Sequence, residues 1–113
     1  MKPIQKLLFL CSRNQRRSVT AEFLYRGFAG YETRSAGTDP GARAMVKPDD
    51  IGWADLIFVM EPQQLRQVRS RFKPQLKGKR LVCLQIPDKY GAMSLELIEV
   101  LKKRLGAYIQ VPE

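Results

Sequence analysis

The sequence predicts a three-layer α/β domain, in which helices cover both faces of a four-stranded parallel sheet. Short apolar runs alternate along the chain with stretches of helical periodicity, which is typical of βαβ units. The clearest of these runs are uninterrupted, as strands buried on both faces are. The 113 residues, 44% of them hydrophobic, suit one domain with a modest core. We therefore expect a single domain over residues 1–113.

Four strands are expected, at Leu7–Leu10, Glu32–Ser35, Leu56–Met60 and Leu81–Ile86. Three main helices are expected, because apolar residues recur at helical spacing within Val19–Phe28, between Pro62 and Pro74, and within Ser94–Arg104. Ser18 is a candidate cap for the first helix, and Pro62 suits the first turn of the second. The stretch from Gly37 to Gly41 is expected to be a loop.

The segment between the first strand and the first helix carries the strongest functional signal. It reads Cys-Ser-Arg-Asn-Gln-Arg-Arg-Ser and spans residues 11–18. Amides of such a loop can point at an oxyanion, and the start of the following helix adds a partial positive charge. The three arginines favour the thiolate form of Cys11 over the thiol. The segment therefore predicts an anion site that also holds a cysteine nucleophile.

This string is the C-x5-R-S signature of the low-molecular-weight protein tyrosine phosphatases, and the chain resembles that family at further landmarks. These landmarks are the helix opening at 17–22, Ser-Ala-Gly-Thr at 35–38 and the apolar stretch at 54–60. The resemblance implies the strand order 2-1-3-4. It also implies a hydrolase that acts on phosphotyrosine in proteins or on a small aryl phosphate. The reaction would pass through a cysteinyl-phosphate and need neither a metal nor a cofactor.

The resemblance also assigns roles to individual residues. Cys11 is the nucleophile, and Arg17 contacts the phosphate with its planar fork. Ser18 donates to the thiolate, Asn14 takes the left-handed backbone of a tight loop, and Ser35 supports Asn14. The residues expected to surround the bound phosphate are Ser12, Arg13, Asn14, Gln15, Arg16 and Ser18.

A general acid is expected on a loop that follows another strand. Asp88-Lys89-Tyr90-Gly91 is similar to the family's acid loop, so Asp88 would protonate the leaving oxygen and later activate water. Tyr90 would flank the ring of the substrate. Asp88 also suits a plain turn after a proline.

The chain departs from the family pattern in ways that point to a shallower, more basic site. Arg13 replaces a loop glycine, Arg16 a second loop cysteine, and Lys89 the proline beside the acid. The segment Asp39–Gly52 is shorter than in the family, and the chain has no histidine.

Two other functions remain open. The net charge of +9 suits a module that binds polyanions such as nucleic acid, although no aromatic residues interleave with the basic ones. A thioredoxin-coupled arsenate reductase shares the loop but needs further cysteines, and only Cys83, expected in the core, is available. Two cysteines favour a reducing cytoplasm, and no apolar run approaches the ~20 residues of a membrane span.

Overall fold

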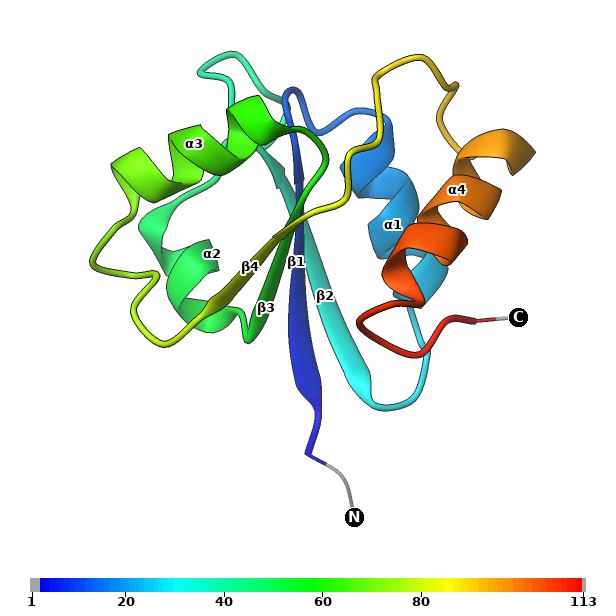
Figure 1. Cartoon of the computed structure of the whole chain (residues 1–113), viewed down its shortest axis with the longest axis horizontal. Helices are drawn as coiled ribbons and strands as arrows, with labels where there is room; N and C mark the ends of the chain where they lie inside the picture. The colour runs from blue at the N-terminus through cyan, green and yellow to red at the C-terminus, as the bar shows by residue number, and fades with distance from the viewer. Residues whose placement is uncertain (1–2, 113) are drawn as a thin grey trace.

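A computed structural model describes residues 3–112 (Figure 1); the predicted domain limits at 1 and 113 lie outside this range. Within it the chain forms four strands and four helices. In chain order these are β1 (Gln5–Cys11), α1 (Arg17–Tyr25), β2 (Tyr31–Gly37), α2 (Pro48–Trp53), β3 (Leu56–Val59), α3 (Pro62–Arg71), β4 (Arg80–Cys83) and α4 (Leu95–Leu105).

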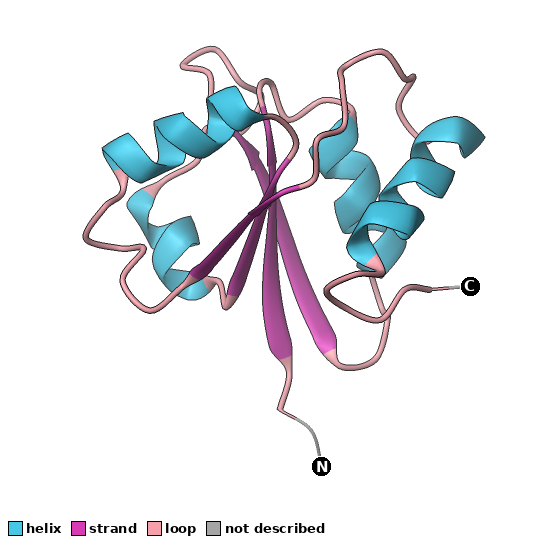
Figure 2. Ribbon diagram, viewed as in Figure 1, coloured by secondary structure: helices cyan, strands magenta, loops and turns pink. Residues whose placement is uncertain are grey.

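The four strands form one parallel sheet of order β2-β1-β3-β4, which confirms the predicted fold class and order. Helices α1 and α4 lie on one face and α2 and α3 on the other (Figures 1 and 2). Cys11, the last residue of β1, pairs with Gly37, the last residue of β2. The carboxyl ends of the strands therefore meet at one edge, where ligands of such sheets bind.

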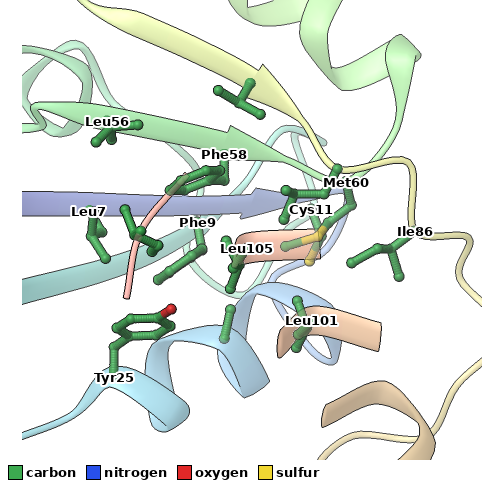
Figure 3. Close-up of a cluster of buried hydrophobic side chains, with 14 of the residues drawn as sticks. Leu7, Phe9, Cys11, Tyr25, Leu56, Phe58, Met60, Ile86, Leu101 and Leu105 are labelled. Atoms are coloured by element: carbon green, nitrogen blue, oxygen red, sulfur yellow. The ribbon is translucent and has the colours of Figure 1, made fainter. Parts of the chain in front are cut away.

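Each face of the sheet has its own hydrophobic cluster, and successive residues of β1 enter the two clusters alternately. Leu7, Phe9 and Cys11 pack toward α1 and α4, as Figure 3 shows, and Leu8 and Leu10 pack toward α2 and α3. All four apolar residues from 7 to 10 are fully buried, which explains the uninterrupted apolar run.

The segment after α4 is also tied to this core. Burial raises the pKa of Tyr25, and its hydroxyl donates to the backbone oxygen of Gln110 at 2.7 Å.

Three local expectations need correction. A short fourth helix, α2, lies in the shortened segment and adds to the three main helices that we expected; Pro48 starts it and Asp50 accepts from the backbone nitrogen of Lys47. Ser18 does not cap α1, which begins at Arg17. The last strand ends at Cys83 instead of Ile86, because Gln85 takes a left-handed conformation with φ of 55°.

No helix within residues 3–112 is long and apolar enough to cross a membrane.

Candidate active site

A cavity of about 300 Å³ opens at the carboxyl edge of the sheet, beside the loop that follows β1. It is lined by Cys11, Ser12, Arg13, Gln15, Arg16, Arg17, Asp39 and Asp88. Sequence reasoning had proposed each of these except Asp39. The cavity therefore brings the expected nucleophile, phosphate ligand and acid together from segments that lie more than 70 residues apart.

The loop between β1 and α1 is held by a buried chain of polar side chains. Asn14 is fully buried and has a φ of 56°, so it takes the expected left-handed backbone. Its amide nitrogen Nδ2 donates to Ser18 Oγ at 2.9 Å. Ser18 Oγ lies 2.9 Å from Cys11 Sγ. The Ser18 hydroxyl thus contacts the cysteine sulfur, and Ser18 lies inside α1, two residues after the N-cap position at Arg16.

The segment that follows β2 forms backbone hydrogen bonds to the same loop. Backbone nitrogens of Thr38, Asp39 and Arg43 donate to the backbone oxygens of Cys11, Ser12 and Arg13 at 2.9, 2.9 and 3.0 Å. These three bonds satisfy the backbone oxygens of residues 11–13, and none of them uses an amide of the loop, so the loop amides can face an anion.

Gly37 permits this close approach. A Cβ atom at that position would lie 2.5 Å from Ala42 Cβ and 2.6 Å from the backbone oxygen of Ser12. Glycine is therefore required here by space, not by backbone conformation.

Arg17 is only 2% exposed, and the nitrogens of its guanidinium group differ in their hydrogen-bond partners. Nη1 donates to Glu61 Oε1 at 2.6 Å and to the backbone oxygen of Ile86 at 2.7 Å. Nε is buried without a hydrogen-bond partner, and a carboxylate oxygen of Asp88 is 3.8 Å away. A buried, unpartnered donor beside a cavity calls for an explanation, and an oxyanion in the cavity supplies one.

Asp88 stands at the rim of the cavity, with its side chain 52% exposed. Its carboxylate lies 4.0 Å from Nη1 of Arg16 and near Arg17. The hydrogen bond from Arg17 to the Ile86 oxygen anchors the loop two residues before Asp88. This loop position suits a group that must reach both a leaving oxygen and water.

Gln64 is a site residue that sequence reasoning missed. It is buried at the start of α3, and its Nε2 donates to Ser12 Oγ at 3.0 Å. Its Oε1 accepts from the backbone nitrogens of Met60 and Glu61. Its place three residues after Glu61, at the N-cap of α3, was the available signal, because a glutamine there can bond back to the helix start.

Ser35 is not the partner of Asn14. Its Oγ donates to Glu22 Oε1 on α1 at 2.7 Å. Ser35 pairs with Phe9, two residues before the end of β1, so its hydroxyl meets α1 below the loop. Arg43 contacts Asn14 instead, with Nε 3.0 Å from the Asn14 backbone oxygen and Nη2 2.9 Å from Oδ1.

Tyr90 is not among the residues that line the cavity. It is partly buried against the cluster under α1 and α4, and Lys89 Nζ lies 5.4 Å from the centre of its ring. The structure therefore does not bring this ring to the cavity wall.

Comparison with known proteins identifies the fold of this chain. No family model matches the chain, and no curated protein matches it. Solved structures do match, at low sequence identity. The tyrosine phosphatase Wzb from Escherichia coli, in complex with phosphate, has a TM-score of 0.71 and 23% identity, over 93% of this chain and 96% of that one. The low-molecular-weight protein tyrosine phosphatase SP-PTP from Streptococcus pyogenes has a TM-score of 0.72 and 13% identity, over 95% of both chains.

A third match is a YwlE arginine phosphatase in which serine replaces the active-site cysteine and is phosphorylated. It has a TM-score of 0.66 and 19% identity, over 91% of this chain and 97% of that one. The structure thus has the fold of the low-molecular-weight protein tyrosine phosphatases. Since one fold can host several functions, the function depends on the residues of the site itself.

Proposed function

We propose that this protein is a cysteine-dependent phosphomonoester hydrolase that works through a cysteinyl-phosphate. One observation carries the proposal: Cys11, the half-satisfied guanidinium of Arg17, and Asp88 line the same cavity. A nucleophile, an anion ligand and an acid are the three groups that such a reaction needs.

In the first step the Cys11 thiolate attacks phosphorus, and an S–P bond forms. The bond from phosphorus to the leaving oxygen breaks, and that oxygen takes the proton of Asp88. Arg17 Nε and the loop amides stabilise the negative charge on the phosphoryl oxygens. The scheme uses no metal ion, because these donors and the start of α1 supply the positive field.

In the second step the Asp88 carboxylate takes a proton from water as the water oxygen attacks phosphorus. The S–P bond breaks, phosphate is released, and the electron pair returns to Cys11 as thiolate. Ser18 lies 2.9 Å from this sulfur and stabilises the departing thiolate with its hydroxyl.

Phosphotyrosine in proteins, or a small aryl phosphate, is the proposed substrate. Two of the compared structures are tyrosine phosphatases by name, and a third is an arginine phosphatase. Exposed Arg13 and Arg16 at the rim suit acidic groups on a phosphoprotein. A panel of phosphotyrosine, phosphoserine and phosphoarginine peptides tests this choice, and a preference for either of the last two would overturn it.

The positions of the two cysteines on opposite faces of the sheet argue against arsenate reduction through a second cysteine. Cys11 belongs to the cluster under α1 and α4, while Cys83 packs against the cluster under α2 and α3. The two thiols, both free, lie on opposite faces and cannot form the disulfide that this reaction would need. Unpaired thiols and a thiolate nucleophile suit a reducing compartment, and we propose the cytoplasm.

The test is hydrolysis of para-nitrophenyl phosphate as a function of pH without added metal, with Cys11→Ser as the matched variant. We expect turnover that vanadate blocks, and loss of turnover in Cys11→Ser with phosphate binding retained. A folded protein that binds phosphate or polyanions in a salt-dependent way without turnover would instead show a binding module.

A further inference from the structure

We propose that Arg43 is a positioning residue that acts on the Cys11 thiolate through Asn14 and Ser18. The proposal deepens the proposed function, and its meaning for catalysis rests on that function. It concerns a side chain outside the cavity, from the short segment after β2.

Arg43 donates hydrogen bonds to two atoms of Asn14. Nε donates to the backbone oxygen of Asn14 at 3.0 Å, and Nη2 donates to Oδ1 at 2.9 Å. The backbone nitrogen of Arg43 also donates to the oxygen of Arg13. Such a forked contact holds both the backbone and the side chain of a residue with left-handed φ.

This contact sets the orientation of the Asn14 side-chain amide. A guanidinium has only donors, so the Asn14 atom that faces it must be the oxygen. The amide nitrogen of Asn14 then faces Ser18 Oγ and donates to it at 2.9 Å. Ser18 Oγ lies 2.9 Å from Cys11 Sγ, and a Cys11 thiolate has no hydrogen to donate, so in that form the single hydroxyl hydrogen of Ser18 is donated to the sulfur.

The chain from Arg43 to Cys11 thus presents a donor to the sulfur, which favours the thiolate as the acceptor. Arg43 itself is exposed, whereas Asn14 and Ser18 are both fully buried, so the links from Asn14 to Cys11 are shielded from water. Hydrogen bonds aligned in one direction polarise one another, and the first of them starts at a cation.

The experiment measures the rate of Cys11 alkylation by iodoacetamide against pH, with mass spectrometry to separate Cys11 from Cys83. No substrate is involved, so the result stands even if the protein proves not to be a phosphatase. For Arg43→Met we expect alkylation at mildly acidic pH to slow about fivefold, with the profile moved to higher pH. Arg43→Lys, which keeps the cation, should recover part of the rate, and Arg69→Met, an exposed arginine of α3, should match the natural chain.

The same substitution in a Ser18→Ala background separates the relay from a simple effect of charge. If Arg43 acts through Ser18, Arg43→Met should add no further change in that background. An equal slowing in both backgrounds would overturn the relay, as would an unchanged alkylation profile in Arg43→Met. Near-ultraviolet circular dichroism checks that each variant is folded; should Arg43→Met not fold, Arg43→Gln, with a neutral donor, is tested by the same criteria.

Discussion

Arg17 Nη1 lies 2.6 Å from Glu61 Oε1, although the two residues are 44 positions apart in the chain. Arg17 is almost fully buried, whereas the Glu61 side chain is 40% exposed. The Glu61 carboxylate and the backbone oxygen of Ile86 both accept hydrogen bonds from Nη1, at the inner end of the guanidinium group. Glu61 therefore orients the group that we assign to phosphate binding.

We expect Glu61→Ala to weaken substrate binding, because Arg17 then keeps only the Ile86 oxygen as its inner partner. KM for para-nitrophenyl phosphate should rise about tenfold, with a smaller fall in kcat. The KM of Glu61→Gln, which keeps an acceptor, should lie between those of the natural chain and of Glu61→Ala. Glu99→Ala, on the exposed side of α4, is the control; a KM in Glu61→Ala equal to that control would remove Glu61 from the site.

Replacement of Asp88 by Asn should make the rate depend on the leaving group. A poor leaving group such as phenol needs a proton in the transition state, and para-nitrophenol hardly does. We expect kcat to fall about 100-fold with phenyl phosphate and about tenfold or less with para-nitrophenyl phosphate.

Asp39 is the other carboxylate that lines the cavity, so Asp39→Asn is the matched comparison. It should slow both substrates to a similar extent. If the dependence on the leaving group appears in Asp39→Asn and not in Asp88→Asn, Asp39 is the acid.

Gly37→Ala should destabilise the protein because the added methyl group meets the backbone of the active-site loop at Ser12. We expect the free energy of unfolding to fall by about 1–3 kcal/mol, as for an overpacked site. Urea denaturation measures the change. Gly41→Ala, where a Cβ meets nothing within 4 Å, should change stability by about 0.5 kcal/mol or less.

Leu101→Ala tests the packing of α4 on the sheet. The Leu101 side chain is fully buried in the cluster of Figure 3, and its truncation should cost about 2–5 kcal/mol of unfolding free energy. Leu95 on the same helix is 80% exposed, so Leu95→Ala should have an effect of about 0.5 kcal/mol or less. Equal midpoints of thermal unfolding for the two variants would show that α4 is not packed as described.

The sequence alone predicted the sheet, its parallel strands and the loop from Cys11 to Ser18. These features depend on neighbours in the chain: an apolar run marks a strand buried on both faces, and six residues suffice to place Arg17 beside Cys11. The strand order came from the family resemblance, and the fold confirms it. Helix α2 escaped prediction because its six residues are too few to show a period.

The partners of the site residues were decided by the tertiary structure. Ser35 was expected at Asn14, yet the register of β2 against β1 places it opposite Phe9 and sends its hydroxyl to Glu22. Other contacts also join distant parts of the chain. Arg43 lies 29 positions from its hydrogen-bond partner, Glu61 lies 44 positions from its partner, and Gln64 lies 52 positions from its partner. Such contacts depend on the path of loops and on strand register, which no local pattern encodes. The residue types of the loop thus follow from the sequence, but the hydrogen bonds that orient them follow only from the fold.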